Sequence, residues 1–417
     1  MSIRNVADTI TKLKLFLGIL FVIMLVFSKY ATSSCIILFI ALSFYNIFFP
    51  NGVWNPQNGI IQIKLFFKHP AFWAITLVFW VIVLGYFNSE NTNYWLSRVR
   101  LRLPFLALPV VFFFLPWSKI DKDSIILFSI ILIFIVSTGV VVNYLNNYNT
   151  MSDLIRSGSS IPVPMKDHVR YAQLEAFVLL TGVYWLITNR SKALLNKIVG
   201  VLLSFIFIYL HILAVRSGIL IAYTGLFCFF ILYIKKLKLK HIMLVLVLTL
   251  TIPFIAYKTI PSLEAKISYG VWEWNKFIEG DPLNNSDSGR WISYKLGLDY
   301  FESEPLFGIG PGDLEDKMTI SYKEKYPDIA SRKQPHNQFL HTMACSGIFG
   351  LIFFLFAFAV PFFTGLKTHN QILVVIIVAS FASFMVESPL ETARGTALIA
   401  FWICLFLKDK DLTKLTP

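Results

Sequence analysis

Charged residues are scarce in this chain of 417 residues, because Asp, Glu, Lys and Arg together make up only 15% of it. Soluble domains usually carry about 25% charged residues. Hydrophobic residues make up 56% of the chain, and phenylalanine alone accounts for 40 positions. No water-soluble globule could bury that much apolar surface, which excludes the soluble classes. The composition indicates a polytopic membrane protein whose helices pack against lipid and against one another.

Cysteines and acidic residues are also few. The four cysteines, Cys35, Cys228, Cys345 and Cys404, lie in apolar segments without the spacing of metal ligands, so we expect neither disulfides nor a zinc site. The 24 acidic residues are outnumbered by 37 basic ones, which gives a formal net charge of +13. The chain has no nucleic-acid-binding motif, and basic cytoplasmic loops explain such a charge in a membrane protein. Nucleic acid is therefore not an expected partner.

Apolar runs of about 20 residues, the length that a membrane-spanning helix needs, dominate the sequence. Residues 103–117 form a short run with Pro104 and Pro109, which favours a re-entrant or kinked segment there. One long polar stretch, residues 259–335, separates the ninth run from the tenth. The sequence therefore predicts an all-α fold of about twelve transmembrane helices in one membrane domain, residues 1–417, with a large outer loop that contains short helices. The twelve predicted spans are 13–29, 31–49, 71–88, 103–117, 124–145, 171–188, 196–215, 217–234, 241–258, 338–363, 371–387 and 392–407.

The distribution of basic residues predicts the orientation of these spans. With the N-terminus inside, eighteen Lys and Arg fall in inner loops and tails and nine in short outer loops, leaving the long loop aside. This bias predicts that both termini are cytoplasmic and that the loop 259–335 lies on the outer face. The inner positive residues are mainly lysines, whereas the outer ones are mainly arginines, which bind phosphate in a bidentate manner. The outer face is thus expected to handle anions, unless its arginines simply pair with acids such as Glu387 and Glu391.

Two helical patterns occur within the long loop. The aromatic-rich segment 271–277 is typical of a structural helix that lies at the membrane interface. The second pattern begins at Asp287-Ser288-Gly289-Arg290, where Asp287 or Ser288 would cap the helix and Arg290 would lie in its first turn. Free N–H groups beside a guanidinium favour anion binding, although an ordinary pairing of Arg290 with Asp287 fits equally well. The alternating glycines of segment 307–313 predict a tight turn, because no βαβ unit surrounds them.

His336 directly precedes the tenth predicted span, and Asn337 is a plausible N-cap for that helix. The helix dipole and nearby arginines would disfavour a protonated ring, leaving neutral imidazole that can accept a proton as a general base. A histidine that merely forms hydrogen bonds at the interface is equally consistent with the local sequence. His341 lies on another face of the helix, so we interpret it as structural.

Further charged residues fall at the same predicted rim. Arg216 occupies a turn of almost no length between two spans, where a charge is costly unless it binds an anion or forms an ion pair. Glu387, Glu391 and Arg394 lie in or beside the last outer turn. These residues could orient His336 or the arginines.

Four short motifs together resemble the O-antigen ligase and polymerase superfamily of membrane glycosyltransferases. They are Arg-Ser-Gly at 216–218, Ser-Gly-Arg at 288–290, Phe-Gly-Ile-Gly-Pro-Gly at 307–312 and His-Asn-x-Phe-Leu at 336–340. The resemblance covers roughly residues 170–400, and the first half matches only in hydropathy and in its basic outer loop. It implies a GT-C-like fold and a metal-independent, inverting glycosyltransferase that needs no cofactor and acts at the periplasmic face of the bacterial inner membrane.

The resemblance also implies substrates and roles. The donor would be a glycan on undecaprenyl diphosphate, and the acceptor a sugar hydroxyl of lipid A-core, both bound among membrane lipids. His336 corresponds to the general base, and Arg216 and Arg290 to the clamp on the donor diphosphate. The alternatives are an O-antigen or capsule polymerase, a protein O-oligosaccharyltransferase, and a non-enzymatic transporter of lipid-linked glycans. Residues expected to support the site or contact substrate are Asn337, Glu387, Glu391, Arg394, Arg98, Arg102 and Arg170.

Overall fold

The computed structural model describes residues 3–156, 160–236, 251, 254–279, 286–329 and 332–408. The described residues are 84% helical and contain no strand, which confirms the predicted all-α class. The α-helices are α1 (Ile3–Phe27), α2 (Lys29–Phe48), α3 (Pro56–Lys68), α4 (Pro70–Ile75), α5 (Leu77–Leu84), α6 (Thr92–Phe114), α7 (Lys119–Asn146), α8 (Tyr148–Arg156), α9 (His168–Thr188), α10 (Ala193–Leu213), α11 (Arg216–Tyr233), α13 (Pro261–Ile278), α14 (Ser286–Ser303), α15 (Leu314–Lys325), α16 (Gln338–Lys367), α17 (Gln371–Val386) and α18 (Ala393–Leu407). Four short 3₁₀ helices join them: η1 (Pro50–Gly52), η2 (Gly85–Asn88), η3 (Ile234–Lys236) and η4 (Pro389–Glu391).

Seven of the described helices are long and apolar enough to cross a membrane, namely α1, α2, α7, α9, α10, α11 and α16. Shorter apolar helices occur in α5 with η2, in α17 and in α18. The chain is therefore a multi-pass membrane protein, and the count of twelve spans stays a prediction. The predicted span 241–258 lies mostly outside the described residues.

Two predicted spans differ from the helices found. Residues 71–88 fall in α4, α5 and η2, with Thr76 between the first two helices. The predicted segment 103–117 is the second half of α6, a continuous helix that begins at Thr92 and contains both prolines. The prediction started too late because the arginines of the first turns of α6 lower its hydropathy, although these turns belong to the same helix.

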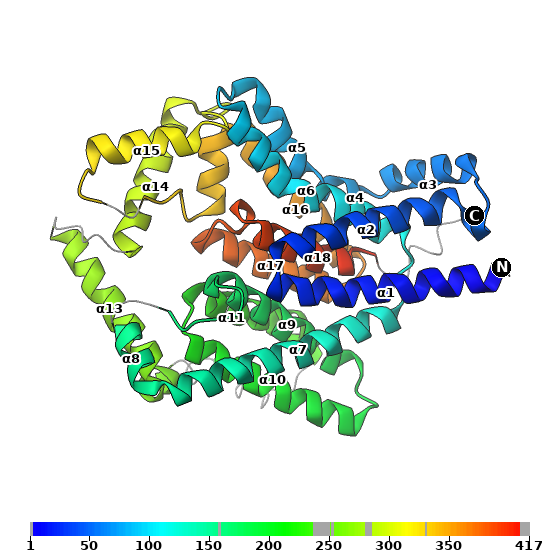
Figure 1. Ribbon diagram of the computed structural model, residues 1–417, viewed down its shortest axis with the longest axis horizontal. Coiled ribbons are helices and arrows are strands. Elements are labelled where there is room, and N and C mark those ends of the chain that lie inside the picture. The colour runs from blue at the N-terminus through cyan, green and yellow to red at the C-terminus, as the bar shows by residue number, and fades with distance from the viewer. Residues whose placement is uncertain are drawn as a thin grey trace.

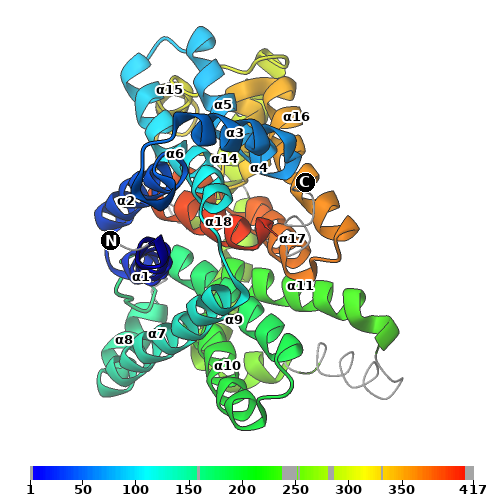
Figure 2. The ribbon, with the colours of Figure 1, turned by 90° about the vertical axis from the view of Figure 1, so that its right-hand side faces the viewer.

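Helices α17 and α18 form the centre of the bundle, as Figures 1 and 2 show. Every residue of α18 from Gly395 to Leu407 is buried, and this helix packs against α2, α6, α9 and α17. Helix α17 packs against α9, α11 and α16. An apolar helix could also face lipid, so it is the burial of α18 on all sides that assigns it to the core. The turn that joins α17 to α18 therefore lies where several helices converge.

The described residues of the long loop form three helices, α13, α14 and α15, which lie at the end of the molecule opposite the start of α1 (Figure 1). The two predicted helical patterns are confirmed in α13 and α14, whereas α15 was not predicted. Helix α14 packs against α16. Apolar side chains of α14 and α15 share a small core with residues of α16, including Ile292, Leu296, Met318, Tyr322 and Cys345.

The glycine-rich segment docks the loop on α16. Gly308 and Gly310 have positive φ angles, and the backbone N–H groups of Ile309 and Gly310 donate to the carbonyls of Ala344 (2.9 Å) and Cys345 (3.0 Å). A Cβ atom at Gly308 would lie 2.4 Å from the Cys345 carbonyl carbon. The predicted tight turn is thus confirmed, and glycine is required there because the two backbones touch.

The same segment is fixed to the start of α6. The Asp313 carboxylate accepts hydrogen bonds from the backbone N–H groups of Glu90 (2.9 Å) and Asn91 (2.8 Å). The amide of Asn88 donates to the carbonyls of Phe307 (2.8 Å) and Gly308 (3.0 Å). The loop therefore ties together the starts of α6 and α16.

Candidate functional site

The turn between α17 and α18 carries two glutamates, four residues apart, and each meets one histidine and two arginines from other helices. Glu387 is the first. Its Oε1 accepts a hydrogen bond from Arg290 Nη2 at 2.9 Å, and its Oε2 lies 3.1 Å from His336 Nδ1. Arg170 Nη2 lies 3.9 Å from the same Oε2. The structure thus brings together residues predicted separately from four regions of the sequence.

The carboxylate of Glu387 is buried, with 5% of its side chain exposed. Burial alone would raise its pKa, but the hydrogen bond to His336 and the charges of Arg290 and Arg170 outweigh burial and lower the pKa. Glu387 is therefore ionised at neutral pH. A charged carboxylate held among two guanidinium groups can orient both of its hydrogen-bonded neighbours.

His336 is held from several directions at the start of α16. Asn337 caps this helix, as predicted, by accepting a hydrogen bond from the Leu340 N–H group at 3.0 Å. The Tyr294 hydroxyl donates to the carbonyl of His336 at 2.9 Å. Because Nδ1 faces the Glu387 carboxylate, the neutral ring holds its proton on Nδ1 and presents the lone pair of Nε2. About a quarter of the side chain is exposed, which leaves the ring accessible to a substrate hydroxyl.

Arg216 and Arg290 line one cavity of about 560 Å³, which also contains Glu387. Arg216 begins α11 two residues after Ala214, whose φ of 51° makes the turn from α10 abrupt. This volume lies in the range of protein ligand sites, about 300–1,000 Å³. The two predicted clamp arginines therefore do face a common space, and His336 adjoins it through Glu387.

One face of α13 forms another wall of this cavity, and sequence reasoning missed it. Lys266, Tyr269 and Glu273 of α13 line the cavity. Arg216 Nη2 donates to the Lys266 carbonyl at 3.4 Å, and a Cβ atom at Gly270 would lie only 2.3 Å from Arg216 Nη2. Lys266, Tyr269 and Glu273 are separated by three, four and seven positions. This spacing could have revealed the wall from the sequence, because it places the three side chains on one helical face. The prediction of an interfacial helix captured only the exposed tryptophans Trp272 and Trp274.

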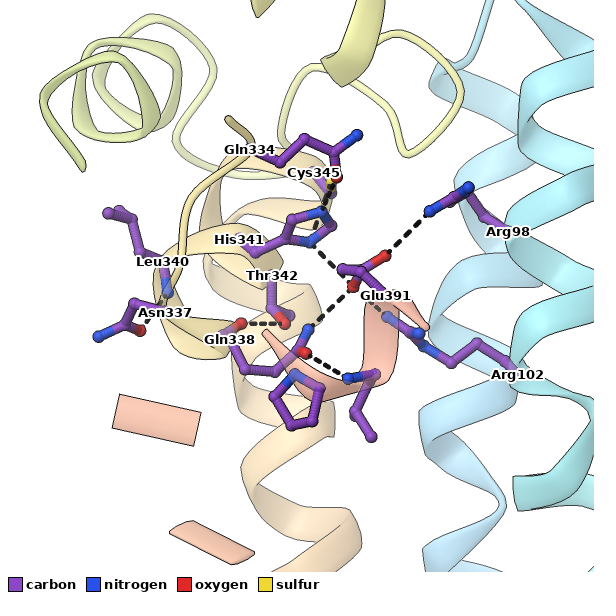
Figure 3. Close-up of polar contacts among 12 residues, drawn as sticks. Arg98, Arg102, Gln334, Asn337, Gln338, Leu340, His341, Thr342, Cys345 and Glu391 are labelled. Carbon is purple, nitrogen blue, oxygen red and sulfur yellow. Dashed lines mark hydrogen bonds and ion pairs between the residues drawn. The ribbon is translucent and has the colours of Figure 1, made fainter. Parts of the chain in front are cut away.

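Glu391 organises the second cluster, which Figure 3 shows around its carboxylate. Arg102 donates to Oε1 of Glu391, and Arg98 Nη1 lies 3.6 Å from Oε2. His341 Nδ1 lies 3.2 Å and Gln338 Nε2 lies 3.0 Å from Oε1. These contacts join α6, α16 and η4, and none of the four partners of Glu391 lines the cavity. For Arg98 and Arg102, the structure favours the alternative of ion pairing over direct anion binding.

The Glu391 cluster is deeply buried, since only 8% of the Glu391 side chain is exposed. Burial would raise the pKa of Glu391, but Arg102, His341 and Arg98 hold it far below its usual value. Breaking such a buried pair by removing one partner typically costs about 3–5 kcal/mol. We therefore interpret this cluster as a structural support for the adjoining turn.

Arg170 and Arg394 have separate surroundings. Arg170 is buried at the start of α9 and donates from Nε to Thr392 Oγ1 at 3.1 Å, beside Glu387. Arg394 donates from Nη1 to the carbonyl of Met165. Arg170 thus supports the Glu387 cluster, whereas Arg394 fastens α18 to the segment before α9.

Comparison with known protein families finds one match, over residues 199–355, to a family described as O-Antigen ligase. The matched segment includes Arg216, Arg290 and His336, and it ends before Glu387. A comparison with curated proteins found no match.

Proposed function

We propose that this protein is an O-antigen ligase that transfers a glycan from undecaprenyl diphosphate to a sugar hydroxyl of lipid A-core, because residues 199–355 match a family described as O-Antigen ligase. The observation that carries the proposal is the contact of Glu387 with both His336 (3.1 Å) and Arg290 (2.9 Å). One carboxylate thereby joins a candidate base to a candidate diphosphate ligand. The same assignment is supported by the cavity that Arg216 and Arg290 both line.

The proposed reaction is a direct displacement. Nε2 of His336 takes the proton from the acceptor hydroxyl, and the hydroxyl oxygen attacks the anomeric carbon of the donor sugar. The bond between that carbon and the diphosphate oxygen breaks, and undecaprenyl diphosphate leaves with the electron pair. Attack opposite the leaving group inverts the anomeric centre. Arg216 and Arg290 stabilise the negative charge that grows on the departing diphosphate.

Glu387 has two tasks in this scheme. By accepting from Nδ1 it fixes the tautomer of His336 that can act as a base, and it stabilises the imidazolium that forms. By accepting from Arg290 it holds that guanidinium toward the cavity, where the diphosphate binds. A single rigid carboxylate therefore sets the distance between the base and the leaving group, which is the geometry that a displacement requires.

The proposed location is the bacterial inner membrane, with both termini cytoplasmic and the site periplasmic. The loop helices α13 and α14 contribute to the cavity, and the basic-residue bias predicts that their loop is external. Metal independence is part of the proposal. Among the residues that the structure describes, no three His, Cys, Asp or Glu side chains are placed to hold a metal ion. Full transfer activity in excess chelator is the expected result, and loss of activity that added metal restores would contradict it.

The direct test is transfer by purified protein from undecaprenyl-diphosphate-linked glycan to isolated lipid A-core. His336→Ala should abolish transfer while the protein remains folded, and Arg290→Lys should be strongly impaired because lysine cannot reproduce bidentate phosphate binding. Arg100→Lys, at an exposed position of α6, is the matched control and should retain wild-type activity. A fully active His336→Ala variant would remove the base from the mechanism.

The acceptor is tested in the same assay. Lipid A-core and a second lipid-linked glycan are offered in parallel. Transfer to lipid A-core identifies a ligase, whereas lengthening of the lipid-linked glycan identifies a polymerase with the same chemistry. No transfer to either acceptor would contradict both.

A further inference from the structure

A second group of polar side chains lines the cavity on the side of α13. Lys266 Nζ donates a hydrogen bond to Ser160 Oγ at 3.0 Å, and His168 Nε2 lies 3.1 Å from the same hydroxyl oxygen. All three residues line the cavity together with Arg216 and Arg290. None of the three belongs to the motifs by which the sequence resembles its family. The proposed mechanism so far uses none of them.

The charges in the cavity show why this group matters. Lys266, Arg216 and Arg290 bring three positive charges to the lining, against the two carboxylates of Glu273 and Glu387. Glu387 already contacts Arg290, Arg170 and His336. A diphosphate carries negative charge on two phosphoryl groups, and Arg290, one of its two proposed arginine ligands, already shares its charge with Glu387. An ammonium group beside a hydroxyl and an imidazole is a suitable partner for the second phosphoryl group.

Helix α13 positions this group well for such a role. Arg216 donates to the Lys266 carbonyl, and its guanidinium lies against Gly270 one turn further along. Lys266 and Arg216 are therefore held close to each other at one wall, while Arg290 is fixed by Glu387 at another. The spacing between two such walls can distinguish a diphosphate from a monophosphate.

We propose that Lys266, Ser160 and His168 form a second phosphoryl subsite, so that this protein recognises its lipid-linked donor as a diphosphate rather than as a monophosphate. This inference rests on the proposed function, because it assumes that the cavity receives the donor. Lys266 supplies the charge, whereas Ser160 and His168 hold the Lys266 side chain in place and offer polar contacts to phosphoryl oxygens.

The experiment measures binding of undecaprenyl diphosphate and of undecaprenyl monophosphate to the purified, full-length protein. Lys266→Gln removes the charge at similar length. It should weaken diphosphate binding about tenfold, the loss expected from one charge-assisted contact, and leave monophosphate binding unchanged. Lys266→Arg should restore most of the affinity for the diphosphate. Lys276→Gln removes a positive charge from the same helix, where Lys276 pairs with Glu279 at 2.9 Å, and should affect neither ligand.

Three outcomes would overturn the inference. Diphosphate binding that is unchanged in Lys266→Gln excludes the subsite. Equal weakening for both lipids shows a general electrostatic or structural effect, and so does a loss of thermal stability that accompanies the loss of affinity. Arg290→Gln separates this inference from the proposed function. If it weakens both lipids while Lys266→Gln changes nothing, only the second subsite fails; if Arg290→Gln has no effect on either lipid, the donor site itself is misplaced.

Discussion

At the scale of single residues, the contact between Glu387 and His336 decides which nitrogen of the imidazole can accept a proton. We predict that Glu387→Gln lowers kcat for transfer by about 10²–10⁴-fold, the usual contribution of a general base. The amide can donate to Nδ1, which would stabilise the tautomer whose Nε2 already carries a proton. Donor affinity should change much less, because the amide oxygen still accepts from Arg290. Steady-state kinetics and a separate donor-binding measurement distinguish the two quantities.

The matched control is Glu324→Gln, at an exposed position of α15, which should leave both kcat and donor affinity unchanged. A Glu387→Gln enzyme with kcat within about threefold of wild type would show that orientation by the carboxylate contributes little. A large loss of donor affinity at unchanged kcat would instead assign Glu387 to the diphosphate site through Arg290.

The sequence identified Arg216 and His336 because charge is scarce in this chain and both lie at the edge of an apolar run, and it identified Arg290 from its place in the first turn of a predicted loop helix. It named Glu387 and Glu391 as possible partners, but it could not tell which of these glutamates contacts which arginine or histidine. His336 and Glu387 are 51 positions apart, and Arg102 and Glu391 are 289 positions apart. Pairing over such distances depends on which helix ends meet in space, and local spacing carries no information on that.

At the scale of elements, α13 has two faces with different roles, and Gly270 separates them. We predict that Gly270→Ala raises the KM for the donor or lowers its affinity by about tenfold, because a Cβ atom there would lie 2.3 Å from Arg216 Nη2 and displace the guanidinium. Alanine is a better helix former than glycine by up to about 1 kcal/mol, so the stability of α13 should not fall. Transfer kinetics measured beside a thermal unfolding curve would show a loss of function without a loss of stability.

Gly200→Ala in α10 is the control, because nothing lies within 4 Å of a Cβ atom at that position. It should preserve both donor affinity and thermal stability. Wild-type kinetics in the Gly270→Ala enzyme would mean that Arg216 moves aside freely and that its place against α13 is not required.

Hydropathy predicted the elements well where helices are apolar throughout, and less well where a helix carries function. The start of α6 was missed because Arg98, Arg100 and Arg102 occupy its first turns, and two of these arginines meet Glu391 rather than water. The cavity face of α13 was missed because its tryptophans dominate the pattern. In both helices, the polar residues that the prediction left out contact the cavity or the Glu391 cluster.

At the scale of the whole molecule, the site forms where many helix ends meet. The starts of α9 and α11, the turn after α17 and the loop helices α13 and α14 line the cavity. Helices α6 and α16 and the residue before α16 supply the partners of Glu387 and Glu391 beside it. The buried pair α17 and α18 fixes the position of that turn within the bundle. Sequence motifs can predict that these ends share one side of the membrane, but the packing around α17 and α18 determines which of them meet.

The last prediction concerns the side of the membrane on which the cavity lies. Helix α16 is interrupted at Gly347, whose backbone angles are not helical, and about 20 residues follow up to Lys367. At 1.5 Å per residue this part is about 30 Å long, which matches the ~30 Å hydrocarbon core, so the two ends of α16 should lie on opposite sides. Lys323 of α15 and Lys367 at the end of α16 are both exposed. With the outer membrane permeabilised, an impermeant thiol reagent should label a Lys323→Cys variant and leave a Lys367→Cys variant unlabelled until the inner membrane is opened. The wild-type protein gives the background, which should be low because Cys35, Cys345 and Cys404 are buried and Cys228 is half-buried. The reverse labelling pattern would place the cavity in the cytoplasm, where a ligase could not meet lipid A-core on the periplasmic face. Labelling of both variants from outside would mean that α16 does not cross the membrane.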